Sequence, residues 1–256
     1  ATQAVHDPFL WGDGLMIHQI RSVLGYHGNE LGRYQRLGEK ESQWRQIANP
    51  SFWRLMNVRY VLTNTADLGI PALKKLMGPI RNSAGTDTYL FELPEKNPFA
   101  WVTPVIVKAN DDAVLATVLD PRFDVRSAAL FDSASTAVGK TIEQLPPPLT
   151  ISVRTASYAP GKISLELSEP APEGSALVVS ENYYPGWNAT IDGKPATASR
   201  ADMTLIGVPL SAGARRVELS FSSSVYEQGK TITLLAIGLS LIAWIAGILM
   251  GRKRSV

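Results

Sequence analysis

The stretch that decides the topology of this chain lies near its carboxyl end. Residues 231–251 read TITLLAIGLSLIAWIAGILMG and contain no charged residue; Lys230 precedes them and a basic run, 252–254, follows. A helix of this length rises about 30 Å, the thickness of the hydrocarbon core of a bilayer. The alternative is a buried core helix, but such helices rarely run so far without a polar face. The sequence therefore predicts one membrane-spanning helix over residues 230–251.

The flanking charges predict the orientation of this helix. Positively charged flanks stay on the cytoplasmic side, so residues 252–256 are expected to form a cytoplasmic tail and residues 1–229 to be extracytoplasmic. Residues 1–30 hold neither a signal peptide core nor a second span, because charged residues interrupt every apolar run. We therefore expect the chain to be the carboxyl-terminal part of a longer membrane protein, with upstream spans of that protein and the lipid bilayer as its partners.

The composition excludes several classes of protein. The chain has 256 residues, of which 45% are apolar and 19% charged, as in a globular protein. Its net charge is +2 and its basic residues are scattered, whereas nucleic-acid binding normally shows as a basic face. It has no cysteine, and the spacing of His6, His18 and His27 matches no metal-ligand pattern. We expect no nucleic-acid partner, no metal and no cofactor.

Residues 1–145 mix helical and extended patterns without strict alternation, which predicts an α+β domain. Asn49-Pro50 and Asn110 are typical of helix starts. Residues 71–77, PALKKLM, begin with proline and end before Gly78-Pro79, which predicts another short helix. Further helices are predicted at residues 14–24 and 33–47, and strands at 58–63, 88–93, 100–108 and 125–131.

The three prolines at 146–148 predict a stiff linker, and the pattern changes after them. Residues 149–224 hold seven short alternating segments, separated by Pro-Gly, Glu-Gly, Asp-Gly and Ala-Gly turns. Such spacing is typical of an antiparallel β-sandwich, immunoglobulin-like or jelly-roll-like. The predicted fold is an α+β domain, then a β-sandwich, then one carboxyl-terminal transmembrane helix.

The stretch GYHGNELGRYQRL (25–37) gathers candidate ligand-binding side chains. If Glu30, Arg33 and Tyr34 lie on a helix, they share one face. Tyr26 and His27 in the preceding loop would then converge with them on an anionic or sugar-like ligand. The alternative is a solvated helix with an internal Glu–Arg pair, and the stretch judged by itself slightly favours this second reading.

A second candidate surface is aromatic. Residues 181–194 read ENYYPGWNATIDGK. Tyr183 and Tyr184 point to opposite faces of a strand, so only one of them is buried on a given side. We predict Trp187 as a core anchor, while an exposed tyrosine remains open to stacking on sugar.

In this order, these segments resemble the carboxyl-terminal region of the YfhO-type bacterial membrane proteins. The resemblance is most specific at NVRYVL (57–62) and at YYPGW and DGK within residues 183–194; GYHGNELGRYQRL and YLFELPEKNPFAWV (89–102) accompany them. That family looks like the GT-C glycosyltransferases, polytopic enzymes of the bacterial cytoplasmic membrane. The resemblance implies a polyprenyl-phosphate-linked sugar as donor and a cell-envelope glycopolymer as acceptor. It also implies a catalytic acidic residue in an early extracytoplasmic loop to which no part of this chain corresponds, so the catalytic residues stay unknown.

Two hypotheses of different class follow. In the first, the chain is the extracytoplasmic region of such a glycosyltransferase, and Arg33 pairs with a donor phosphate. In the second, it belongs to a non-catalytic, membrane-anchored envelope protein whose β-sandwich binds glycan or a partner protein. The substrate-binding residues expected under the first hypothesis are Tyr26, His27, Glu30, Arg33, Tyr34 and Tyr184. Upstream spans with an acidic first loop favour the enzyme, and a single signal peptide favours the binder.

Overall fold

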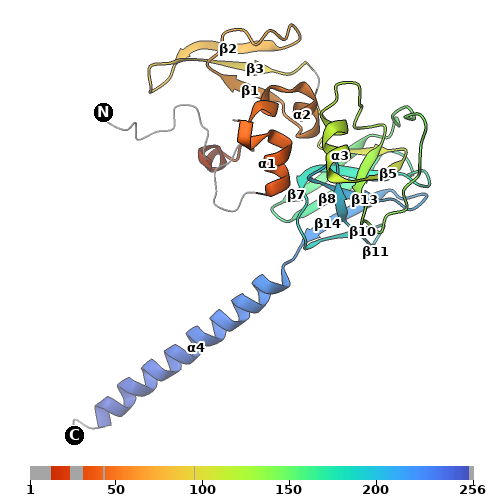
Figure 1. Cartoon of the computed structure of the whole chain (residues 1–256). Helices are drawn as coiled ribbons and strands as arrows, with labels where there is room; N and C mark the ends of the chain where they lie inside the picture. Colours follow the sequence, from red (N-terminus) through yellow and green to blue (C-terminus); the bar gives the residue numbers. More distant parts are fainter. Residues whose placement is uncertain (1–12, 24–30, 43, 95, 254–256) are drawn as a thin grey trace.

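The structure, a computed structural model, describes residues 13–23, 31–42, 44–94 and 96–253. It is a mixed α/β fold with short helices, three sheets and one long terminal helix. The three-stranded sheet lies at one end of the body, and the helix α4 (Ser224–Lys253) projects from the other end (Figure 1).

Short helices fold the amino-terminal part of the described chain. They are η1 (Asp13–His18), α1 (Gly32–Gly38), η2 (Lys40–Ser42), η3 (Arg45–Ala48) and α2 (Pro50–Leu55). The predicted start at Asn49-Pro50 is confirmed, because the Asn49 side chain accepts a hydrogen bond of 2.8 Å from the backbone N–H of Ser51. The single helix predicted over 33–47 is wrong. Glu39 and Trp44 adopt left-handed backbone angles (φ 53° and 59°), which end one helical segment and begin the next.

The three-stranded sheet corrects another prediction. Its order is β1 (Tyr60–Thr63), β3 (Asp87–Glu92) and β2 (Lys74–Arg81), all antiparallel. Residues 74–77, predicted as part of a helix, lie in β2. The Lys75 ammonium lies 5.1 and 5.6 Å from the ring centroids of Tyr89 and Phe91 on β3. Cross-strand packing therefore prevails over a local helix preference.

Two larger sheets form the rest of the body. The first has the order β4 (Ala100–Thr103), β9 (Ala176–Asn182), β13 (Leu205–Pro209), β12 (Ser199–Ala201), β6 (Ala129–Asp132) and β5 (Ile106–Ala109). The second has the order β11 (Lys194–Ala196), β10 (Trp187–Ile191), β14 (Arg216–Phe221), β8 (Lys162–Leu167) and β7 (Val153–Ala159). Only the β5–β6 pair among these is parallel in the described chain. The helix α3 (Asp111–Val118) connects β5 to β6, and Asn110 caps it as predicted.

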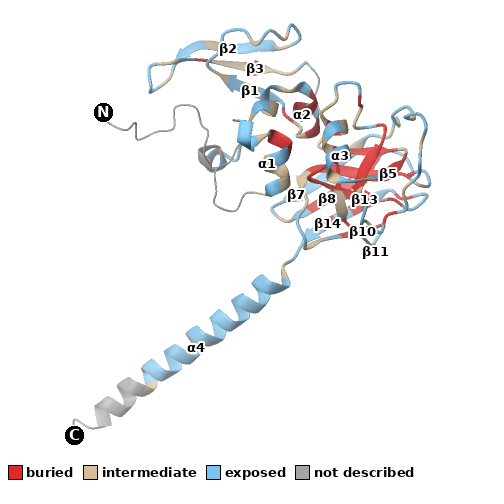
Figure 2. Cartoon of the chain, viewed as in Figure 1, coloured by how far each residue is buried: buried red, intermediate tan, exposed pale blue. Residues whose placement is uncertain are grey.

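The six-stranded sheet is buried on both faces. On β9, Leu177 and Val179 belong to a core shared with the five-stranded sheet, which supplies Leu165 and Val217 among others. Val178 belongs to a second core, which holds buried side chains of α2 and α3. Buried residues gather accordingly in the two larger sheets (Figure 2). The strand pairing thus gives two cores, one on each face of this sheet.

The strands of this sheet come from both sides of the predicted linker. β4, β5 and β6 precede residues 146–148, whereas β9, β12 and β13 follow them. The predicted division between 1–145 and 149–224 therefore runs through one sheet. The reason is that strand pairing is non-local: Ala100 pairs with Val179, and Ala201 pairs with Phe131. The local sequence pattern of a strand does not predict such partners.

The terminal helix is the one element of the described chain that is long and apolar enough to cross a membrane. The candidate span covers Ser224–Ala246, and none of it is buried against the body. It begins six residues before the predicted start at residue 230 and has the composition expected of a helix in lipid.

Candidate functional site

The sequence-predicted ligand residues fall into two groups. Tyr26, His27 and Glu30 lie outside the described residues. Arg33, Tyr34 and Tyr184 are described, and each lies in a different environment.

Arg33 links α1 to the start of α3. Its Nε donates to Asp111 Oδ2 at 2.8 Å and its Nη2 donates to Asp111 Oδ1 at 3.3 Å. Beside this bidentate pair, Arg36 Nη2 donates to Asp112 Oδ1 at 2.7 Å. Both aspartates occupy the first turn of α3, where negative charge is favourable. The Arg33 side chain is still 40% exposed, so part of it remains accessible to solvent.

Tyr34 lies in a packed environment. Its ring centroid lies 6.2 Å from that of Trp44 and 6.4 Å from that of Phe52, and its hydroxyl donates to the carbonyl of Val23. Burial raises the pKa of this hydroxyl above its ordinary value. In this structure Tyr34 joins three helical segments, and its ring faces protein.

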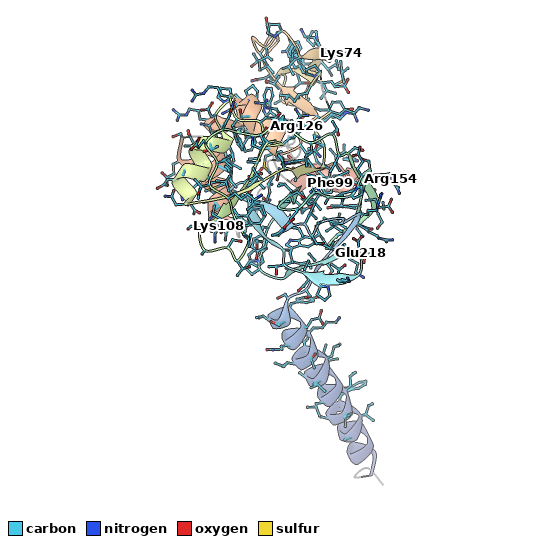
Figure 3. All side chains as sticks on the ribbon, turned by 90° about the vertical axis from the view of Figure 1, so that its right-hand side faces the viewer. Lys74, Phe99, Lys108, Arg126, Arg154 and Glu218 are labelled. Carbon is cyan, nitrogen blue, oxygen red and sulfur yellow. The ribbon has the colours of Figure 1, made fainter. Side chains whose placement is uncertain are left out.

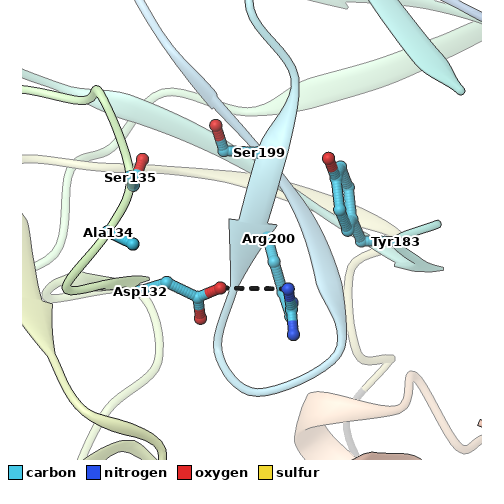
Figure 4. A pocket seen from close by; sticks show the side chains of 6 residues that line it. All are labelled: Asp132, Ala134, Ser135, Tyr183, Ser199 and Arg200. Carbon is cyan, nitrogen blue, oxygen red and sulfur yellow. Dashed lines mark ion pairs between the residues drawn. The ribbon is translucent and has the colours of Figure 1, made fainter. Parts of the chain in front are cut away.

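A small open hollow of about 170 Å³ lies between β6 and β12 (Figure 4). Arg200 Nη2 lies 3.1 Å from Asp132 Oδ2, and the Arg200 guanidinium carbon lies 5.8 Å from the Tyr183 ring centroid. The exposed fractions of the Arg200 and Asp132 side chains are only 21% and 26%, so solvent screens this ion pair less than a surface pair. The lining residues are Asp132, Ala134, Ser135, Tyr183, Ser199 and Arg200.

The Arg33–Asp111 pair acts electrostatically on this hollow. Burial raises the pKa of Asp132; the positive charge of Arg33 opposes that rise and the negative charge of Asp111 adds to it. Lys108 borders the same region, since its Nζ donates to the Ser135 carbonyl at 2.5 Å. The charge of the sequence-predicted Arg33 therefore acts on Asp132, a residue that the sequence did not single out.

The arrangement is suited to holding a polar ligand. It offers a guanidinium, a carboxylate, two hydroxyl side chains and an aromatic ring around a hollow that is open to solvent, the groups that orient hydroxyl-rich ligands. The Asp132 carboxylate is already engaged by Arg200, so it is not a free general base. Among the described residues, no group of three or more histidine or acidic side chains is arranged to hold a metal.

Sequence reasoning missed the central pair of this site. Asp132 ends β6, and Arg200 lies in the middle of the three-residue strand β12. The two strands pair only through Ala201 and Phe131, and neither residue belongs to a motif. The aromatic run at 181–194 was singled out from the sequence, and one of its residues does line the hollow. That residue is Tyr183, whereas the prediction chose Tyr184.

Tyr184 and Trp187 lie at the end of the five-stranded sheet nearest α4. Tyr184 is 54% exposed, and its ring centroid lies 6.4 Å from that of Phe221. Trp187 lies 5.6 Å from Phe221 by the same measure and packs at the margin of the core between the sheets. This agrees with a structural role for Trp187 and leaves Tyr184 accessible.

Comparison with known proteins identifies one family. The sequence profile of a family described as "Bacterial membrane protein YfhO" matches residues 125–233. No curated protein and no solved structure matches the chain. The matched range contains the lining of the hollow, the aromatic run and the start of α4. The chain's resemblance to the YfhO family of bacterial membrane proteins is thereby confirmed over residues 125–233.

Proposed function

We propose that this chain is the extracytoplasmic, membrane-anchored region of a polytopic glycosyltransferase-like protein, and that the hollow at Asp132 and Arg200 binds its glycan substrate. The observation that carries the proposal is the shielded Asp132–Arg200 pair beside Tyr183 at an open hollow, inside the range that matches a membrane-protein family. Residues 1–229 then face the envelope, and the basic tail lies in the cytoplasm.

The chemistry of the hollow supports a sugar ligand. A carboxylate and a guanidinium hydrogen-bond neighbouring hydroxyls in a fixed geometry, and a tyrosine ring packs on the apolar face of a pyranose. Arg33, whose side chain is 40% exposed, is proposed to contact a donor phosphate. Tyr184 is proposed as a further contact, and so are Tyr26, His27 and Glu30. Tyr34, whose ring and hydroxyl face protein, is not proposed as a contact.

In the proposed reaction, an acceptor hydroxyl oxygen attacks the anomeric carbon of a polyprenyl-phosphate-linked sugar. The new oxygen–carbon bond forms as the bond from that carbon to the phosphate oxygen breaks. The lipid phosphate leaves with the electron pair, and an acidic residue elsewhere in the protein accepts the hydroxyl proton. The contribution of this chain is to bind and orient the acceptor and, through Arg33, to contact the donor phosphate.

The test compares Arg200→Gln with Arg154→Gln in the chain held in lipid nanodiscs. Arg154 forms an exposed pair with Glu166 and lies on the opposite side of the body from Lys108 (Figure 3). Lys108 Nζ donates to the carbonyl of Ser135, which lines the hollow. Binding of purified teichoic acid is measured by biolayer interferometry. We expect Arg200→Gln to weaken binding about tenfold or more, as for a lost charged hydrogen bond, and Arg154→Gln to leave it unchanged. Equal binding by the two variants would refute the assignment of the hollow.

The envelope binder is the second candidate, and one observation favours it. The described site holds an engaged carboxylate and no unengaged acid–base pair around the hollow, which is a binding arrangement. Sugar transfer from a labelled polyprenyl-phosphate donor, measured in membranes that carry the full-length protein, separates the two functions. Transfer that depends on Arg200 supports the enzyme, whereas binding without any transfer supports the binder.

A further inference from the structure

Three aromatic side chains, Tyr184, Trp187 and Phe221, lie together where the five-stranded sheet passes into α4; we refer to them as the aromatic collar. Phe221 ends β14, and α4 begins three residues later at Ser224. The ring of Phe221 contacts those of both other members, with centroid separations of 6.4 and 5.6 Å. The collar is therefore continuous with the base of the candidate membrane span.

Backbone and side-chain hydrogen bonds connect the collar to that base. The Ser222 N–H donates to the Gly186 carbonyl at 2.9 Å. The Asn188 side chain donates to the same carbonyl at 2.9 Å and to Ser222 Oγ at 3.1 Å. The loop that carries Tyr184 thus cannot move independently of the segment that leads into α4.

The collar leaves apolar surface exposed beside the base of α4. Tyr184 is 54% exposed and Phe221 is 39% exposed. The first turn of α4 continues the surface, with Val225 and Tyr226 exposed by 78% and 67%. Tyrosine and tryptophan combine an apolar ring with a polar group, and they are enriched at the headgroup level of membranes.

The part of α4 that precedes the uncharged stretch is short, so the collar lies close to the level of the lipid headgroups. The first seven residues of α4 include Glu227 and Lys230, and at ~1.5 Å per residue they rise about 10 Å. The headgroup layer of each leaflet extends roughly 5–8 Å beyond the hydrocarbon core. A spanning helix is tilted on average by about 20°, which brings one side of the body nearer to the lipid.

A positive charge lies at the same end of the sheet. Lys162 begins β8 next to Gly161, whose carbonyl accepts a 2.8 Å hydrogen bond from the N–H of Phe221. Its side chain is exposed, and a lysine at this height attracts anionic lipid headgroups. Aromatic rings and a cation at the base of a span together match a lipid surface.

We propose that the aromatic collar docks on the headgroup layer of the bilayer that α4 crosses, and so holds the body at a fixed height and tilt above the lipid. The proposal rests on α4 spanning the membrane and is independent of sugar transfer. A second copy of this chain or another segment of the parent protein is the competing occupant.

The chain has no cysteine, so one introduced cysteine can be labelled selectively. Tyr184→Cys carries an environment-sensitive fluorophore in vesicles of phosphatidylcholine with a minor fraction of phosphatidylglycerol. The matched control is Val138→Cys, an 82% exposed position beside Ile191 at the other end of β10. Leu239→Cys, in the middle of the candidate span, reports whether α4 lies in the bilayer.

We expect lipids with a headgroup nitroxide to quench the Tyr184→Cys label several-fold more than the Val138→Cys label, and acyl-chain nitroxides to quench the Leu239→Cys label most. Equal, weak quenching at positions 184 and 138 would overturn the proposal. Blue-shifted emission at position 184 without quenching by lipid would also overturn it, because protein would then cover the collar. An unquenched label at position 239 would overturn the premise that α4 spans.

Discussion

Replacing Asp202 by asparagine should stabilise the protein at and above neutral pH. Asp202 is fully buried in the turn between β12 and β13. Its Oδ1 accepts a 2.8 Å hydrogen bond from the Leu130 N–H, while its Oδ2 has no hydrogen-bond partner among the described residues. Burial raises the pKa of this carboxyl to about 7, and the Leu130 bond opposes that rise.

The sign and size of the effect of Asp202 on stability follow from the linkage of proton binding to folding. Below about pH 4 the carboxyl is protonated in both the folded and the unfolded chain, so it has no effect on their balance. Between about pH 4 and pH 7 only the unfolded chain loses the proton, so stability falls as the pH rises. The difference between about 7 and the unfolded value of 3.8 corresponds to a loss of at most about 4 kcal/mol above pH 7. Asparagine keeps the shape and the Leu130 acceptor, and it tolerates the left-handed backbone at this position (φ 47°).

The assay is thermal unfolding of the full chain in nanodiscs, followed by tryptophan fluorescence from pH 4.5 to pH 8.5. We expect the midpoint difference between Asp202→Asn and the unmodified chain to grow through this range and to level off above pH 7. Asp87→Asn, at an exposed aspartate of β3, is the matched control for loss of one charge. Parallel pH profiles of Asp202→Asn and the unmodified chain, or a variant that is less stable at pH 8, would refute the reasoning.

Three further substitutions should lower the unfolding midpoint in the same assay. Gly186→Ala should cost about 2 kcal/mol, because the backbone has φ +122° and a Cβ would lie 2.5 Å from the Ser222 carbonyl oxygen; no change would mean that this loop does not pack on the base of α4. Gly207→Ala should cost about 1–3 kcal/mol, since its Cβ would lie 2.6 Å from the Phe131 ring; a neutral result would contradict tight packing here. Asn49→Ala should lower the stability by about 1 kcal/mol, because α2 loses its cap. Asn49→Asp keeps a capping oxygen and should retain most of that stability.

The parts of the fold that the sequence predicted are those with local causes. Asn49 and Asn110 start helices because a side-chain oxygen meets a backbone N–H two or three residues later. The apolar length of residues 231–251 is a local property as well. These features depend on neighbouring residues alone, so a single sequence reveals them.

What the sequence did not reveal depends on pairing across long separations. Residues 74–77 form a strand because β3 lies beside them, although proline at 71 and Gly78-Pro79 suggested a helix. The triple proline at 146–148 suggested a boundary, yet strands on both sides of it pair in one sheet. A local pattern limits where a strand begins and carries no information on its partner.

The candidate site shows the same contrast between local features, which the sequence reveals, and contacts between distant residues, which it does not. The sequence grouped Arg33 with its neighbours in residues 25–37, where only helix-face geometry was available. In the structure its carboxylate partner is Asp111, 78 residues further along. The Asp132–Arg200 pair is equally non-local and contained no motif by which it might have been recognised.

The residues that form the hollow and those that support it come from different parts of the sequence. The lining of the hollow lies wholly within residues 125–233, the range that matches the family, but the sheet that holds it extends beyond that range. β4 pairs with β9, and β5 pairs with β6. Without β4, β9, whose residues 176–180 are all buried, would become an exposed apolar edge, and without β5, β6 would become the opposite edge. The Arg33–Asp111 pair, which shifts the pKa of Asp132, also comes from outside the range. The proposed ligand contacts and the charges that act on Asp132 thus come from separate segments of the chain, so a substitution that removes the Arg33 charge should raise the pKa of Asp132 further while the shape of the hollow, held by β6 and β12, persists.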